Sequence, residues 1–274
     1  MLVFPNAKLN LGLYVTERRP DGFHRLESVF LPLPWTDVLE IVPAPAGQAT
    51  GITLSGRPIP GDPATNLCLK AYELLQADYP ALPAALLYLH KIVPIGAGLG
   101  GGSADAAFAL KAANELFSLN LSVETLEGYA RRLGSDCAFF IRNQPVLALE
   151  RGDVFEEIEL SVAEMPCVVV YPNLHISTAE AFARIVPKPP AQFLRAALAR
   201  PLETWRATVS NDFEAALAPA FPVLAHIKQQ LYAAGAAYAS LSGSGSAVYG
   251  LWPPGQEPAL MRWPAEFTVW QGKL

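Results

Sequence analysis

The chain has 274 residues, of which 51% are hydrophobic and 16% charged, and its formal net charge at pH 7 is −5. This length is enough for two modest domains, each with its own core. The acidic balance argues against broad nucleic-acid binding, and no apolar run approaches the roughly 18 residues of a membrane-spanning helix. Polar residues interrupt the first ten positions, so we expect no signal peptide and a cytoplasmic protein without membrane partners. Three cysteines, Cys68, Cys137 and Cys167, lack metal-ligand spacing and are expected as buried thiols.

The first ninety residues indicate several strands and one helix. Alternating side chains predict strands at Ala7–Val15, Arg25–Leu33 and Val38–Val42. Apolar residues at helical spacing predict a helix over Asn66–Leu75, and the apolar run Leu86–Val93 predicts a further strand.

Lys8 lies in the first of these strands, between apolar neighbours. Strict alternation places it on one face with Asn6 and Asn10. An isolated lysine in a strand is ordinarily a solvated surface residue, whereas this polar face could also line a cleft. The residues leave both interpretations open.

The most informative segment follows the strand at Leu86–Val93. Five glycines fall within Gly96–Gly102, and an alanine-rich segment with helical spacing comes directly after them. A strand, a glycine loop and a helix together present unpaired N–H groups and the positive end of a helix to an anion. Glycine also leaves no Cβ in the space of a phosphate. We therefore predict a phosphate-binding loop rather than a flexible linker, with Ser103 as helix N-cap and Asp105 in the first turn.

Two familiar phosphate loops fit this segment poorly. A Walker A loop needs a lysine after its last glycine, and Gly102 stands at that position. Three of the glycines match the dinucleotide pattern G-x-G-x-x-G, but that fingerprint also requires a following strand that ends in an acidic residue. The next segment instead predicts a second helix, which begins at Ser122 and stops at Gly134. The dinucleotide interpretation is therefore a distant alternative.

Asp136 follows this second helix and precedes an apolar segment that predicts another helix. The helix dipole keeps a carboxylate ionised at such a position. From spacing alone, an N-cap is the simpler interpretation of Asp136, since aspartate is common there. A catalytic base that accepts a proton is the alternative.

The second half of the chain contains both strands and helices. Short apolar runs predict strands at Val146–Leu149, Val154–Leu160, Cys167–Tyr171, Ala237–Leu241 and Ala247–Leu251. Helical spacing and cap residues predict helices at 177–182, Gln192–Ala199, Asp212–Ala218 and Pro222–Ala233. The last two strands flank a second glycine-rich segment.

Three segments, in a fixed order and spread over almost the whole chain, carry a family resemblance. Residues 94–104, Pro-Ile-Gly-Ala-Gly-Leu-Gly-Gly-Gly-Ser-Ala, resemble the phosphate-binding motif of the GHMP kinases. Residues 241–247 resemble the C-terminal glycine motif of the same superfamily. Residues 4–15 and 19–24 narrow the resemblance to the branch that phosphorylates 4-diphosphocytidyl-2-C-methyl-D-erythritol. Together the matches are far more specific than any one of them alone.

The resemblance implies a two-domain α+β fold. It places an N-terminal domain related to ribosomal protein S5 domain 2 at residues 1–160 and a ferredoxin-like domain at 161–274. It also implies an ATP-dependent kinase of the non-mevalonate isoprenoid pathway that phosphorylates a 2-hydroxyl by in-line transfer. ATP is the expected co-substrate, Mg²⁺ is expected with it, and a monomer or homodimer is the expected state.

The same resemblance assigns roles to matching positions. Lys8 and Asp136 form the reactive pair, with the aspartate as base and the lysine as charge stabiliser. The ATP-binding positions are Pro94, Ile95, Gly96, Ala97, Gly98, Leu99, Gly100, Gly101, Gly102, Ser103 and Ala104, together with Asn66 and Lys91. The substrate-binding positions are Asn10, Phe23, His24, Phe30, Phe182, Gly243, Ser244 and Gly245. No side chain is assigned to a metal.

Cytosine recognition departs from the family pattern at one position. A cytosine needs a flat apolar sandwich and hydrogen-bond partners for its polar edge. Phe23 and Phe182 can stack, and His24 can hydrogen-bond. The family usually has tyrosine at the position of Phe23, so stacking is retained while a hydroxyl bond is lost. Without the resemblance, Phe23, Phe30 and Phe182 would be interpreted as core residues.

Two other functions are weaker alternatives. The chain could bind nucleotides without transfer activity, or it could phosphorylate homoserine or mevalonate. A degenerate member would be expected to lose its lysine or its aspartate, and this chain retains both. A homoserine kinase would not need the segment 20–24.

Overall fold

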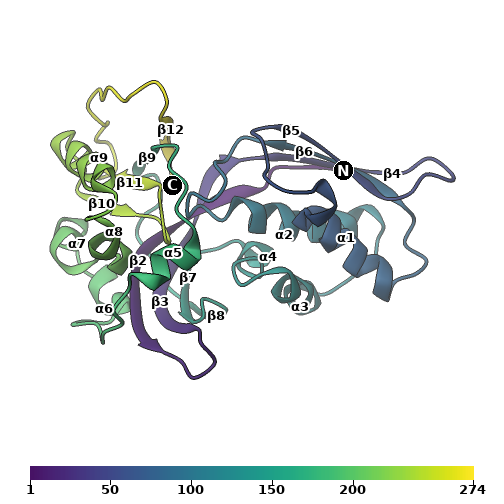
Figure 1. Cartoon of the computed structure of the whole chain (residues 1–274), viewed down its shortest axis with the longest axis horizontal. Coiled ribbons are helices and arrows are strands. Elements are labelled where there is room, and N and C mark those ends of the chain that lie inside the picture. The colour runs from purple at the N-terminus through teal and green to yellow at the C-terminus, as the bar shows by residue number, and fades with distance from the viewer. The chain divides into compact units, whose positions relative to one another are not determined.

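The computed structural model describes all 274 residues, which form two compact units (Figure 1). The first unit comprises Met1–Ala7, Trp35–Ile95 and Gly100–Gln144, and the second comprises Lys8–Pro34, Gly96–Leu99 and Pro145–Leu274. Both units are built from separated segments, so they do not divide the chain at one position. A domain boundary at residue 160 stays a prediction.

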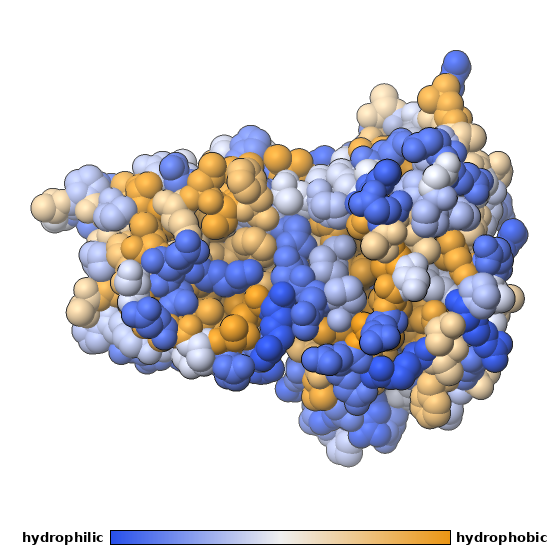
Figure 2. All heavy atoms as spheres, turned by 180° about the vertical axis from the view of Figure 1, so that it is seen from behind, coloured by the Kyte–Doolittle hydropathy of each residue, from blue (hydrophilic) through white to orange (hydrophobic).

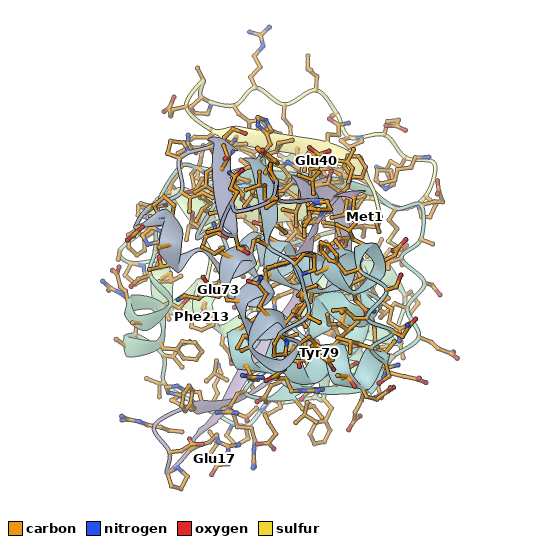
Figure 3. The ribbon with its side chains drawn as sticks, turned by 90° about the vertical axis from the view of Figure 1, so that its right-hand side faces the viewer. Met1, Glu17, Glu40, Glu73, Tyr79 and Phe213 are labelled. Atoms are coloured by element: carbon orange, nitrogen blue, oxygen red, sulfur yellow. The ribbon has the colours of Figure 1, made fainter.

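The first unit is a four-stranded sheet with helices packed against it. Its strands, in spatial order, are β1 (Leu2–Val3), β4 (Val38–Pro43), β6 (Ala85–Lys91) and β5 (Gly51–Gly56), and only the β5–β6 pair is parallel. Its helices are the 3-10 helix η1 (Pro63–Thr65), α1 (Leu67–Asp78), α2 (Gly101–Leu116), α3 (Val123–Leu133) and α4 (Phe139–Arg142). Helix α2 packs against β4 and the helices around it. Met1 lies near Glu40 in Figure 3, as the antiparallel pairing of β1 with β4 requires.

Side-chain caps set the ends of two of these helices. Asn66 caps α1 by accepting a hydrogen bond from the Cys68 backbone N–H at 2.9 Å. Ser122 caps α3 by accepting from the Thr125 N–H at 3.2 Å, and α3 ends at Gly134. These caps satisfy N–H groups that have no partner within the helix. The predicted second helix and its two ends are therefore confirmed.

The second unit contains two four-stranded sheets and five helices. One sheet has the order β10 (Tyr238–Leu241), β11 (Val248–Leu251), β9 (Pro166–Tyr171) and β12 (Thr268–Lys273). The other has the order β2 (Asn6–Arg18), β3 (His24–Thr36), β7 (Val146–Glu150) and β8 (Val154–Glu157). The helices are α5 (Thr178–Ala183), α6 (Leu194–Leu198), α7 (Leu202–Thr208), α8 (Asp212–Leu217) and α9 (Pro222–Ala233). Helix α9 packs on β10 and β11.

The core of the second unit forms around strand β9. All six residues of β9 are buried, since it lies between two strands and beneath helices. Val168 and Val170 join Phe213, Ile227 and Trp252 in one apolar cluster. Burial of such side chains is the main favourable contribution to folding. The α+β class is confirmed by these mixed elements.

Five elements have no counterpart in the sequence predictions: β1, β5, η1, α7 and β12. Strands β5 and β12 are at sheet edges and are buried only in part, so their apolar alternation is weak. Helix α7 has only seven residues, which gives little room for a helical period. In addition, β8 ends at Glu157 rather than at the predicted residue 160.

Apolar and polar side chains are interspersed on the face seen in Figure 2. The three cysteines, Cys68, Cys137 and Cys167, are free and buried, as predicted. None of the helices combines the length and the apolar character needed to cross a membrane.

Candidate active site

The predicted phosphate loop connects β6 to α2, in the expected order of strand, glycine turn and helix. Helix α2 begins at Gly101, and its N-cap is Gly100, whose φ of +70° is in the left-handed region that favours glycine. A Cβ on Gly101 would lie 3.2 Å from Lys91 Nζ and 3.3 Å from Val93 Cγ1. The helix therefore starts with bare backbone, which suits an anion at a helix N-terminus.

The loop residues separate by burial. The buried ones are Pro94, Ala97, Leu99, Gly101 and Ala104, whereas Gly96 and Gly102 are exposed and Ile95, Gly98, Gly100 and Ser103 are half-buried. The larger apolar side chains are thus mostly turned inward, and two glycines face solvent. This arrangement is compatible with a backbone surface for phosphate.

Two predictions about the start of α2 are wrong. Ser103 is not the N-cap: it lies inside the first turn, and the cap residue Gly100 makes no side-chain hydrogen bond. Asp105 is not in the first turn, since α2 begins at Gly101, and it is a buried residue that pairs with Lys91 Nζ at 2.6 Å. Glycine has no side chain to signal a cap, which is why the next polar residue seemed the better candidate.

A pocket of about 180 Å³ lies beside α1 and α2 in the first unit. Its lining includes Asn66, Lys91, Ile95, Gly102 and Asp105. A concave, partly apolar pocket with a few polar groups is the usual form of a small-molecule site. The structure thus brings together four predicted ATP-binding residues, Asn66, Lys91, Ile95 and Gly102, and adds Asp105.

Lys91 is the centre of a buried ionic triad. Its Nζ donates to Asp37 Oδ2 and to Asp105 Oδ2, and the exposed fractions of the three side chains are 4% or less. The other oxygen of Asp37 accepts from the backbone N–H groups of Ile92 and Val93, at 2.6 and 2.9 Å. Asp37 therefore holds the end of β6 where the chain enters the glycine loop.

The triad has unusual proton affinities. Burial raises the pKa of the Asp105 carboxyl to about 7, although the Lys91 ammonium opposes this shift. Burial alone would lower the pKa of Lys91, but the carboxylates of Asp105 and Asp37 outweigh it and raise that pKa overall. The charge of Lys91 is therefore already compensated within the triad. Sequence reasoning missed Asp37 entirely, since a single aspartate between two strands is no motif.

Lys8 lies on β2 in the second unit and is only 3% exposed. Its interpretation as a solvated surface residue is therefore wrong. Lys8 Nζ donates to Asn10 Oδ1 and lies 4.9 Å from the centroid of the Phe30 ring. Asn10 Nδ2 in turn donates to Ser28 Oγ at 2.8 Å. Lys8 and Asn10 are thus neighbours, as predicted, and belong to one buried polar cluster.

Phe30 offers no open stacking surface for a nucleobase. Its side chain is 3% exposed, and the ammonium of Lys8 lies over its ring. The Phe155 ring lies 6.2 Å away on the same sheet. A cation is attracted to the face of an aromatic ring. Phe30 is thus buried beside Lys8, and its role in substrate binding stays a prediction.

The other predicted cytosine residues lie in the second unit. The rings of His24 and Phe182 are stacked, with centroids 4.8 Å apart, and Phe23 is 54% exposed. Burial lowers the pKa of His24, and the nearby charge of Arg18 lowers it further. The imidazole is therefore neutral at pH 7, with one donor and one acceptor nitrogen.

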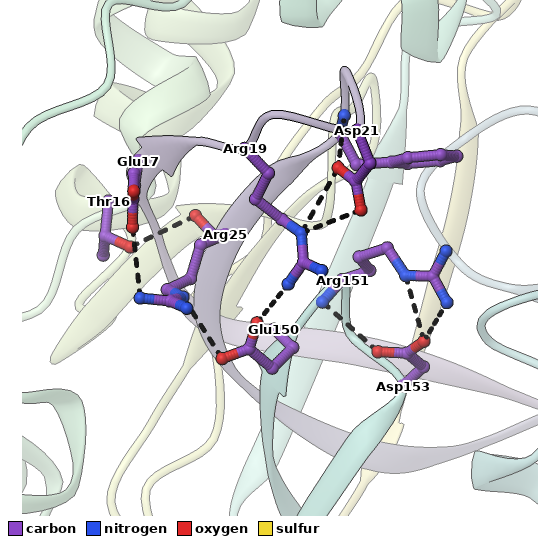
Figure 4. A network of polar contacts seen from close by, with 9 residues as sticks. Thr16, Glu17, Arg19, Asp21, Arg25, Glu150, Arg151 and Asp153 are labelled. Carbon is purple, nitrogen blue, oxygen red and sulfur yellow. Dashed lines mark hydrogen bonds and ion pairs between the residues drawn. The ribbon is translucent and has the colours of Figure 1, made fainter.

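Ion pairs support the turn between β2 and β3 that carries Phe23 (Figure 4). Arg19 pairs with Asp21 and with Glu150, and the Phe23 N–H donates to Asp21 Oδ1 at 3.1 Å. The guanidinium carbon of Arg151 lies 5.1 Å from the centroid of the Phe23 ring. These side chains are substantially exposed, so each pair is individually weak.

The C-terminal glycine loop, between β10 and β11, lies against residues 96–99. Ser242 Oγ donates to the Gly98 carbonyl oxygen at 2.9 Å and accepts from the Asn10 N–H at 3.2 Å. A Cβ on Gly98 would lie 2.0 Å from the Ser242 carbonyl oxygen, so only glycine fits there. A Cβ on Gly243 would lie 3.2 Å from Asn10 Oδ1. The structure therefore brings Gly98 of the first glycine motif, the C-terminal glycine motif and Asn10 together in the second unit.

Asp136 lies in the turn between α3 and α4 of the first unit and is half-buried. Helix α4 begins at Phe139, and its N-cap position is Ala138. The interpretation of Asp136 as a helix cap is therefore wrong. A catalytic role for Asp136 stays a prediction.

Both halves of the chain match models of one family. The model described as "GHMP kinases N terminal domain" matches residues 66–144, and the one described as "GHMP kinases C terminal" matches residues 193–262. These ranges include the phosphate loop, Asp136 and the C-terminal glycine loop.

Relatives named 4-diphosphocytidyl-2-C-methyl-D-erythritol kinase match the chain over nearly its full length. One from Bacteroides fragilis is 48% identical over 97% of both chains, and one from Bacteroides thetaiotaomicron is 46% identical over 100% of both. A crystal structure of 4-(cytidine 5'-diphospho)-2C-methyl-D-erythritol kinase superposes with a TM-score of 0.76 at 30% identity, covering 92% of this chain and 90% of that one.

More distant structures share the fold alone. A homoserine kinase from Cytophaga hutchinsonii has a TM-score of 0.65 at 19% identity, covering 90% of this chain and 84% of that one. The Methanococcus jannaschii mevalonate kinase has a TM-score of 0.67 at 16% identity, covering 92% of this chain and 90% of that one. The chain therefore belongs to the GHMP kinase family and is a small-molecule kinase with the two-part α+β fold of that family.

Proposed function

We propose that this kinase transfers the γ-phosphoryl group of ATP to the 2-hydroxyl of 4-diphosphocytidyl-2-C-methyl-D-erythritol, in the non-mevalonate isoprenoid pathway. The observation that carries the proposal is the identity of 46–48% with relatives of that name, over 97–100% of both chains. Three free, buried cysteines suit a reducing compartment, and we place the enzyme in the cytoplasm.

In this proposal, ATP binds to the glycine loop and the start of α2. Exposed glycine backbone and the helix dipole favour the phosphates. The adjacent pocket, with Asn66 and Lys91 in its lining, holds the nucleoside part. Because Asp37 and Asp105 already neutralise Lys91, this lysine shapes the pocket and contributes little charge to the phosphates.

The chemistry is assigned to Asp136 and Lys8. Asp136 accepts the proton of the attacking hydroxyl, and Lys8 stabilises charge as the phosphoryl group moves. The bonds of Lys8 to Asn10 and its position over Phe30 support this role, since they hold the ammonium in one place. A fixed charge stabilises a transition state without reorganisation during the reaction.

The cytidine end of the substrate is assigned to the second unit. Phe182 and the exposed ring of Phe23 provide stacking surfaces, and the neutral His24 can both donate to and accept from the polar edge of cytosine. Gly243, Ser244 and Gly245 are assigned to the rest of the substrate. This arrangement does without the tyrosine hydroxyl that the family usually has.

Magnesium fits this site as a metal that arrives with ATP. The chain contains no group of three or more His, Cys, Asp or Glu side chains that could hold a metal. Mg²⁺ usually keeps several waters and binds through one or two carboxylates and substrate phosphates. When bound, it would neutralise charge on the triphosphate.

A coupled assay of ADP release with a panel of alcohols tests the substrate. We expect turnover with 4-diphosphocytidyl-2-C-methyl-D-erythritol and none with homoserine or mevalonate. Turnover with either of the other alcohols, and none with the cytidine compound, would reject the proposal.

The mechanism is tested by Asp136→Asn in single-turnover kinetics. Loss of the proton acceptor should lower the rate by about 10²-fold or more, with ATP affinity near normal. Asp78→Asn, on α1 of the same unit, is the matched control and should keep its rate. Lys8→Ala should also depress the rate, and the double variant should be far less than additively worse. Near-normal turnover of a folded Asp136→Asn enzyme would exclude Asp136 as the base.

A further inference from the structure

The segment Ser210–Glu214 connects two functional parts of the second unit, and its role is not explained by the residues discussed so far. It lies beside strand β2, which carries Lys8 and Asn10. The Leu13 N–H donates to the Ser210 carbonyl oxygen at 3.0 Å, and the Val15 N–H donates to Asp212 Oδ2 at 2.8 Å. Two successive bonds of this kind fix the position of β2 against the segment.

Asn211 extends from the same segment to the C-terminal glycine loop. Its side chain is 2% exposed, and Nδ2 donates to the carbonyl oxygens of Leu241 and Gly243, at 2.9 and 2.8 Å. Asn211 Oδ1 accepts from the Phe213 N–H at 3.0 Å and caps α8. One buried amide therefore holds two carbonyls of the loop and one helix end.

Glu214 also binds the end of β10, directly before the C-terminal glycine loop. Its Oε1 accepts from the Leu241 N–H at 2.8 Å and from Ser240 Oγ at 2.9 Å. Both polar groups of the Leu241 backbone are thus bonded to side chains of Ser210–Glu214. These bonds fix the direction in which the C-terminal glycine loop leaves β10.

The bond to Gly243 determines which way the next N–H points. A peptide unit is planar and trans, so the Ser244 N–H points opposite to the Gly243 carbonyl. Because Asn211 draws that carbonyl inward, the Ser244 N–H is turned away from Asn211. Ser244 is half-buried, whereas all other residues of 241–250 are buried. Successive backbone N–H groups of a loop can form an anion-binding concavity, to which the Ser244 N–H could contribute one donor.

We propose that Asn211 is a positioning residue of the kinase: it orients the Gly243–Ser244 peptide so that the Ser244 N–H contacts a phosphate oxygen of a substrate. The segment Ser210–Glu214 also ties this loop to the strand of Lys8 and Asn10. The inference rests on the proposed function, in which both substrates carry phosphates. The oxygen belongs either to ATP or to the diphosphate of the acceptor, and kinetics with each substrate varied separately distinguishes the two.

The test compares Asn211→Asp with Asn114→Asp. Asp still caps a helix, so Asn211→Asp keeps the bond to Phe213, but it replaces the donors to Leu241 and Gly243 by a buried carboxylate that repels both carbonyl oxygens. Asn114 lies on α2 in the first unit and makes a similar pair of bonds to the backbone of Leu121. Asn114→Asp therefore controls for the change from amide to carboxylate itself. Asn211→Ser, a neutral residue that also caps, serves as the second variant.

We expect kcat/KM for one substrate to fall by about tenfold or more in both Asn211 variants, with the other substrate changed by less than about threefold. Hydrogen exchange of the peptide 241–248 should be faster in these variants, and Asn114→Asp should change neither quantity. A purely structural role would lower the melting temperature without this split between substrates.

Two results would overturn the inference. One is unchanged kcat/KM for both substrates in folded Asn211→Asp and Asn211→Ser. The other is failure of both variants to fold while Asn114→Asp folds, which would make Asn211 a folding residue. If the wild-type enzyme rejects the cytidine substrate, the proposed function fails, but the kinetic split is still measured with the alcohol that it accepts.

Discussion

Two of the ionic networks in the chain have opposite character. Lys91, Asp37 and Asp105 form one in the first unit, with side chains at most 4% exposed. The network at the β2–β3 turn of the second unit includes Arg19, Glu150 and the Arg151–Asp153 pair, with side chains 20–43% exposed (Figure 4). Similar groups meet at similar distances, but only one network is removed from water.

The difference in solvent access determines what each network can do. A buried ion pair costs desolvation energy, and loss of one partner leaves an uncompensated charge in the interior. An exposed pair is screened by water and salt and contributes little to stability. The triad therefore holds the start of the glycine loop rigidly. The exposed network orients a turn whose aromatic residue, Phe23, is 54% exposed.

The largest expected effect is that of Lys91→Met. Removal of the ammonium leaves Asp37 and Asp105 buried together, and the free energy of unfolding should fall by about 3–5 kcal/mol. Denaturant unfolding measures this loss, with Lys70→Met, an exposed lysine on α1, as the matched control. A loss below about 1 kcal/mol would show that the triad contributes no more to the free energy of unfolding than the surface network does.

The triad should also make stability depend on pH. The folded-state pKa of Asp105 is raised from its ordinary 3.8 to about 7, so its contribution is present below pH 3.8 and is lost as pH rises through 7. The stability of the wild type should therefore fall as pH rises from 5 to 7. Asp105→Asn should remove that slope. Parallel pH profiles of wild type and variant, from denaturant unfolding, would contradict it.

Phe182→Ala tests the aromatic contacts beside the exposed network. Loss of one base–aromatic stack should weaken binding of the cytidine substrate by roughly 1–3 kcal/mol and leave ATP binding almost unchanged. Calorimetric titration with each ligand measures both. Equal losses for the two ligands would indicate general damage to the second unit, because Phe182 also packs against Phe213.

The smallest effect is expected for Arg151→Gln. An exposed ion pair and an exposed cation–π contact each contribute about 1 kcal/mol or less, so unfolding should hardly change. KM for the cytidine substrate should rise by less than about fivefold, and the rise should shrink at high salt. A stability loss as large as that of Lys91→Met would abolish the distinction between the two networks.

Much of the candidate site was predictable because its motifs are contiguous. The glycine run before α2 and the cap at Ser122 are local features, and the sequence predicts each at its position. The errors were local as well. Gly100 caps α2 without a side chain, so Ser103 was chosen in its place. Asp136 was given a capping alternative because the short turn before α4 leaves no mark in residue spacing.

The sequence by itself determined the order of most strands and helices, the phosphate loop and the family, since periodicity and motif spacing are properties of neighbouring residues. Tertiary structure alone decided that Lys91 meets Asp37, 54 residues away, and that Asn211 reaches the carbonyl of Gly243. It also decided that the ring of Phe30 lies beneath the ammonium of Lys8. These contacts depend on strand register and on which faces become buried together, and such long-range choices leave no periodic signal in the chain.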